Sequence, residues 1–148
     1  MRTVAVFVGG VALSFLVTAM LVGALMPHYG ELIVALFNTP PNSPKWHDLW
    51  IQWQHFTRIG VYVIGPLTGL AVGIFVGMAQ RNRPVPLALC CLAPEFLLGF
   101  LGDRAKNWSN SISGILFYVL DQSYPFVAAA IAAYLLHRLA HPHQASTE

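Results

Sequence analysis

The chain has 148 residues, of which 56% are hydrophobic and only 9% are charged, and its formal net charge is +2. Ordinary soluble domains carry about 25% charged residues, so a soluble fold of this length lacks the polar side chains to cover its apolar ones. The small net charge, without a basic run, argues against nucleic acid as a partner. The sequence therefore predicts an all-α, polytopic membrane protein whose main surroundings are the lipid bilayer.

Four segments are apolar and close to the roughly 20 residues that cross the hydrocarbon core of a bilayer. The first is longer than the core of a signal peptide, and no clear cleavage site follows it, so we expect it to be retained. The last is interrupted at 121–125, where a re-entrant hairpin is the alternative to a single crossing. The segments, 4–26, 56–78, 85–101 and 112–136, predict a single four-helix transmembrane bundle over residues 1–140, followed by a polar tail at 141–148.

The loop between the first two spans carries three tryptophans at helical spacing. Ser43 followed by Pro44 is typical of a helix start. Trp46, Trp50 and Trp53 then recur at i, i+4 and i+7 and share one helical face. Because tryptophan favours the headgroup level of a bilayer, we expect an interfacial segment that leads into the second span. The alternative is a platform on which a ligand stacks.

The second span carries four glycines at strict four-residue spacing. Each step drifts by about 40° around a helix, so the glycines share one face, and their missing side chains let another helix approach closely. We expect this glycine zipper to pack within the chain, because the first span offers Gly10, Ser14 and Thr18 at the same spacing. A seam in a homo-oligomer is the alternative. The glycines are Gly65, Gly69, Gly73 and Gly77.

Two carboxylates lie within predicted spans, where isolated charges are costly and ionisable groups are the default functional candidates. Glu95 is in the third span and Asp121 is in the fourth, at similar depths from the loop between them. Antiparallel neighbours would bring the two together, and the pair would then hold a proton or a cation. Arg58 enters the second span from the same side, so it is the nearest countercharge. The alternative is a purely structural role for all three side chains.

The even number of predicted spans places both termini on one side of the membrane. The excess of lysine and arginine on that side assigns it to the cytoplasm. We therefore expect a multi-pass protein of a cell membrane, the inner membrane of a bacterium, with both termini cytoplasmic.

No catalytic motif stands out in the sequence. Phosphate-binding glycine loops, zinc-protease helices and nucleophile elbows are absent, and no acid or cysteine joins the helical pair His137 and His141. We therefore expect no enzyme activity, no metal and no cofactor. The predicted function is that of an accessory or packing subunit, with a membrane-protein partner or a homo-oligomer. The alternative is a small transporter or channel that uses the carboxylate pair.

Overall fold

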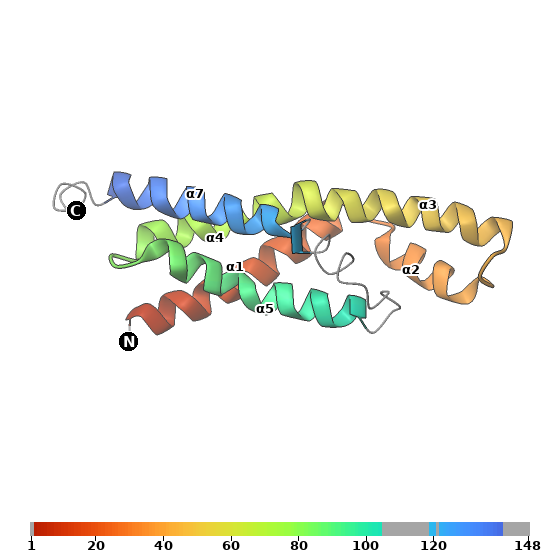
Figure 1. Cartoon of the computed structure of the whole chain (residues 1–148), viewed down its shortest axis with the longest axis horizontal. Coiled ribbons are helices and arrows are strands. Elements are labelled where there is room, and N and C mark those ends of the chain that lie inside the picture. The colour runs from red at the N-terminus through yellow and green to blue at the C-terminus, as the bar shows by residue number, and fades with distance from the viewer. Residues whose placement is uncertain (1, 105–118, 121, 141–148) are drawn as a thin grey trace.

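The computed structural model describes residues 2–104, 119–120 and 122–140, and of residues 100–104 only the helical backbone. All the elements that it describes are helices (Figure 1). In chain order they are α1 (Arg2–Leu25), α2 (Tyr29–Asn38), α3 (Pro44–Ile59), the π-helix η1 (Gly60–Ile64), α4 (Gly65–Ala79), α5 (Pro84–Arg104) and α7 (Ser123–Ala140). Two helices are long and apolar enough to cross a membrane: α1 and the continuous helix Pro44–Ala79.

Four of the described helices, α1, α4, α5 and α7, pack together along their lengths (Figure 1). α4 and α5 contact each other, and each of them also contacts both α1 and α7. Consecutive helices of this group run in opposite directions, so that α1 begins and α7 ends at the same end of the molecule (Figure 1). The chain is therefore all-helical, with an antiparallel bundle as its packed part.

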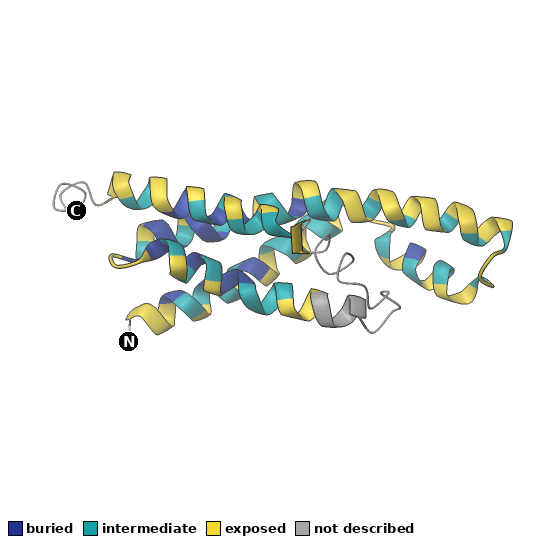
Figure 2. Cartoon of the chain, viewed as in Figure 1, coloured by how far each residue is buried: buried dark blue, intermediate teal, exposed yellow. Residues whose placement is uncertain are grey.

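The core of the bundle is built from small and β-branched side chains. Val72 and Val76 of α4 are fully buried, as are Cys91 of α5 and both Ala129 and Ala133 of α7. Buried residues lie where the four helices meet, whereas most of α3 is exposed (Figure 2). Where α4 meets α7, small residues let the two backbones approach closely, while larger side chains such as Phe7, Leu87 and Phe126 pack around the core.

The glycine face of α4 lies against α7. A Cβ atom added at Gly69 would collide with the backbone of Pro125, and one at Gly73 would collide with the backbone of Ala129. At Gly77 the added atom would lie 2.8 Å from the carbonyl oxygen of Ala133. The zipper partner within the described residues is thus α7 rather than the first span. The fourth glycine, Gly65, has only ordinary contacts, the nearest at 3.4 Å.

The tryptophan segment leads directly into the second span, because α3 continues in line through η1 into α4 (Figure 1). The continuous helix Pro44–Ala79 has 36 residues. Its length is about 54 Å at the usual rise, against about 30 Å for a hydrocarbon core. α2 folds back on α3, and together they extend past the other helices (Figure 1).

The structure describes the predicted fourth span, 112–136, only in part. α7 begins at Ser123, and Gln122 before it is in a turn, within the interruption that the sequence indicates at 121–125. Pro125 lies in the first turn of α7, where a missing N–H costs no helical hydrogen bond. Residues 112–118 and the tail at 141–148 lie outside the described part of the chain.

Candidate functional site

An open cavity of about 750 Å³ lies where the bundle meets the α2–α3 extension. Residues of every described helix contribute to its wall, η1 among them with Gly60, Val61 and Ile64. η1 precedes Pro66, whose ring has no N–H and would clash with the carbonyl four residues earlier in a regular helix. The Gly65 N–H instead reaches the carbonyl of Gly60, five residues back. Such π-helical turns are frequent at functional sites.

Glu95 of α5 lines this cavity and is half-buried. Its Oε2 atom accepts a hydrogen bond of 2.8 Å from the hydroxyl of Ser14, which is fully buried on α1. The Oε1 atom accepts no hydrogen bond from the described part of the chain. Within the described residues, the carboxylate is therefore oriented by one donor, the hydroxyl of Ser14.

One turn further along α1, a second polar contact borders the cavity. The hydroxyls of Thr18 and Thr68 share a hydrogen bond of 3.0 Å, and Thr68 is almost fully buried. Both side chains line the cavity. The small stripe on α1 that resembled a helix-packing face thus supplies the polar groups of the site.

Aromatic rings line the cavity at two levels. Phe96, next to Glu95, meets Phe126 of α7 edge-on, with ring centroids 5.6 Å apart. At the α2–α3 end, Tyr29 stacks on Trp53 at 5.5 Å and meets Phe56 edge-on at 6.3 Å. All five side chains belong to the cavity wall.

Arg58 lines the cavity but does not lie beside Glu95. It is exposed, and no ion pair joins the two side chains within the described residues. The Thr18–Thr68 contact sets the register of α4 against α1. Counting along the helices from it places the Cα of Arg58 about 20 Å along the bundle from that of Glu95. Arg58 therefore lies at the mouth of the cavity, toward the α2–α3 extension.

Asp121 lies outside the described residues, so the structure does not describe the predicted carboxylate pair. The next residue, Gln122, lines the cavity that contains Glu95. The pair of Glu95 and Asp121 remains a prediction, and this cavity is its predicted location.

The three tryptophans have different surroundings. Trp46 and Trp50 stack on each other, with centroids 5.3 Å apart, and Trp53 stacks on Tyr29 instead. Trp50 and Trp53 belong to the cavity wall. Both earlier interpretations of these residues, as depth anchors or as a stacking platform, are compatible with this arrangement.

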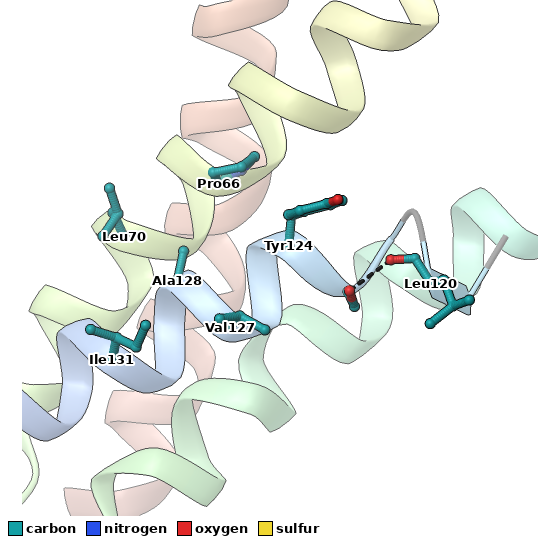
Figure 3. A pocket seen from close by; sticks show the side chains of 8 residues that line it. Pro66, Leu70, Leu120, Tyr124, Val127, Ala128 and Ile131 are labelled. Atoms are coloured by element: carbon teal, nitrogen blue, oxygen red, sulfur yellow. Dashed lines mark hydrogen bonds between the residues drawn. The ribbon is translucent and has the colours of Figure 1, made fainter. Parts of the chain in front are cut away.

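A second hollow, of about 580 Å³, lies on the outer face between α4 and α7 (Figure 3). Its wall is mostly apolar and includes Leu70, Val127 and Ile131, all at least 40% exposed. The Ser123 hydroxyl there donates to the carbonyl of Leu120 at 2.6 Å. Since the described residues of this groove include no charged group, the cavity around Glu95 is the better candidate site.

Sequence reasoning did not identify Ser14, Thr18 and Thr68 as site residues. The sequence pattern does not distinguish a site role for them, because a serine or threonine every fourth residue on a helix fits close packing and ligand binding equally well. In the sequence, Pro66 is the indication of the π-helix. It is a weak one, because proline inside an apolar helix more often produces a kink.

Comparisons with protein-family models, with curated proteins and with solved structures found no match for this chain. Its class therefore follows from the structure itself. Its described residues are all-helical, with two helices long and apolar enough to cross a membrane and with a carboxylate in an open cavity.

Proposed function

We propose that the chain is a small four-span membrane transporter or channel in which Glu95 binds the transported cation. α1, the η1–α4 part of the long helix, α5 and α7 are the spans, in a bacterial inner membrane with both termini cytoplasmic. The observation that supports this function is the position of Glu95: it lies at an open cavity and is held by one hydrogen bond from Ser14. The proposed activity is binding and transport rather than catalysis.

The free-energy cost of a charge inside a membrane bundle supports transport over a purely structural role for Glu95. A carboxylate within a membrane bundle is expensive unless it is paired or hydrated, and such groups mark ion and substrate pathways. A dry, closed bundle would have favoured the packing subunit. The described residues instead leave a cavity within the range of about 300–1,000 Å³ that small-molecule sites occupy.

An accessory subunit is the second proposal, because α2 and α3 extend beyond the bundle (Figure 1). Val34, Phe37 and Ile51 on this extension are between 42% and 66% exposed. Apolar side chains exposed away from the bundle fit contact with lipid headgroups or with a membrane-protein partner. The two proposals make different predictions for Glu95.

Glu95→Gln tests the transport proposal. Proteoliposomes that contain the protein are adsorbed to a solid-supported membrane, and concentration steps of protons, sodium ions and benzyltrimethylammonium are applied in turn. We expect a charge movement from the wild-type chain and none above empty liposomes from the variant, because glutamine can still accept from Ser14 but cannot bind a cation as a charge.

Glu31→Gln is the matched control, since Glu31 pairs with His28 at 3.2 Å on the surface of α2 and its side chain is 82% exposed. It should keep the wild-type response. A wild-type trace equal to that of empty liposomes would contradict transport and favour the accessory subunit. Full amplitude in Glu95→Gln would exclude Glu95 as the cation site.

A further inference from the structure

We infer that the ligand of the cavity is a lipophilic organic cation, that is, a single positive charge on an apolar, partly aromatic body. The inference rests on the proposed function and names the substrate class of the same site. Three properties of the cavity support it: its volume, the position of its charges and its aromatic surfaces.

The volume favours an organic molecule over a bare ion. The cavity measures about 750 Å³. One water molecule takes about 30 Å³ of liquid volume, so a proton or a hydrated metal ion would leave most of the cavity to bulk water. A drug-sized ligand would fill it and release that water from the aromatic surfaces.

The charges favour a cation at the inner end. Among the described residues of the cavity wall, Glu95 and Arg58 carry formal charges. Arg58 lies about 20 Å away along the helices and is exposed to solvent, beyond a Debye length of about 8 Å. Within the described residues of the wall, Glu95 is thus the formal charge at the inner end of the cavity. The polar neighbours of Glu95, namely Ser14 and the Thr18–Thr68 pair, are uncharged.

The aromatic surfaces favour an apolar body around that charge. Phe96 and Phe126 meet edge-on beside Glu95, and Tyr29, Trp53 and Phe56 form a second group toward the mouth. The face of an aromatic ring attracts a cation, and the attraction grows when water is excluded. A carboxylate with two aromatic groups thus binds a charged, bulky ligand more strongly than a small hydrated one.

Tetraphenylphosphonium is the probe, and its binding to the full chain in nanodiscs is measured by equilibrium dialysis against empty nanodiscs. We expect saturable binding to the wild type, and Glu95→Gln should weaken it by about tenfold or more, equivalent to about 1.4 kcal/mol or more. Phe96→Leu should weaken it severalfold. Phe15→Leu, which removes a ring from a 40%-exposed position on α1, should leave it unchanged.

Two further probes test the class on the wild-type chain alone, so the result does not depend on a variant folding. Tetraphenylborate has the same body with the opposite charge, and tetramethylammonium has the charge without the body. Neither should bind measurably. Equal binding of tetraphenylborate, equal binding of tetramethylammonium, or undiminished binding to Glu95→Gln would each overturn the inference.

The two proposals fail separately. If the wild type gives the Glu95-dependent charge movement but does not bind tetraphenylphosphonium, the transport function stands and the ligand class is wrong. If neither signal appears, both the transport function and the ligand class are wrong.

Discussion

Replacement of Gly73 by leucine is expected to prevent the bundle from assembling. The position lies against the backbone of Ala129, and an added Cβ atom would also lie 2.8 Å from the Cβ of Ala132. Overpacking a well-packed core costs about 1–3 kcal/mol even when side chains can adjust. Here a backbone is the obstacle, so the two helices must separate along their whole contact. We expect aggregation, or loss of the folded peak in size-exclusion chromatography.

Two matched variants test whether collision with the α7 backbone is the cause. Ile74→Leu changes the neighbouring residue, which is 42% exposed. Because this substitution conserves the side-chain volume, it should leave the unfolding temperature almost unchanged. Gly65→Ala adds a Cβ atom with ordinary contacts of 3.4 Å or more, so it should be tolerated or slightly stabilising. A well-folded Gly73→Leu chain would show that α4 and α7 do not pack as described.

Restoring a regular α-helix at η1 is expected to abolish transport while the bundle still folds. The change is Pro66→Ala, because the proline ring excludes the regular hydrogen bond and so causes the wide turn. A π-turn accommodates one residue more than an α-turn, so when the same residues adopt regular α-helical turns, α3 rotates against α4 by about 100°. Trp53 and Phe56 then leave the cavity wall, so the charge movement should fall to the level of empty liposomes.

Pro66→Ala combined with deletion of Val63 is the control, since the deletion removes the residue that the wide turn accommodates and so keeps the orientation of α3. It should retain the charge movement. Thermal unfolding of Pro66→Ala should stay close to that of this control, because α4 and α7 keep their contact. If Pro66→Ala transports normally, the orientation of α3 does not contribute to the site.

Local patterns in the sequence predicted the helices well, because each depends on residues near one another. The apolar runs predicted helices close to α1 and α5, and the glycine spacing predicted a face without side chains. Ser43 before Pro44 predicted the start of α3, and its hydroxyl accepts from the N–H of Trp46 at 3.1 Å. These features follow from helix geometry and capping alone.

The arrangement of the helices was less predictable, since it depends on which surfaces fit together. Both Gly10 on α1 and Ala129 on α7 offered small residues to the glycine face, and only the packed structure distinguishes α7 as its partner. The Ser14–Glu95 hydrogen bond joins residues 81 positions apart, so no local pattern indicates it. The distance of Arg58 from Glu95 likewise depends on the register of α4 against α1, which the Thr18–Thr68 contact sets.

Transport through this chain requires a water-accessible cavity that reaches Glu95 inside a membrane bundle. The reactivity of Glu95→Cys toward a membrane-impermeant, cationic methanethiosulfonate, in sealed vesicles of both orientations, tests for such a cavity. Cys90 is replaced by serine, because it is exposed, whereas Cys91 is fully buried. Ile74→Cys, at nearly the same depth but on the outer face of α4, is the comparison.

The account predicts that Glu95→Cys reacts only when the reagent is added on the side that carries α2 and α3, and that Ile74→Cys does not react from either side. Gln54→Cys at the cavity mouth should react faster from that same side. If Gln54→Cys reacts while Glu95→Cys stays unmodified from both sides, the bundle is dry around Glu95 and the account is contradicted.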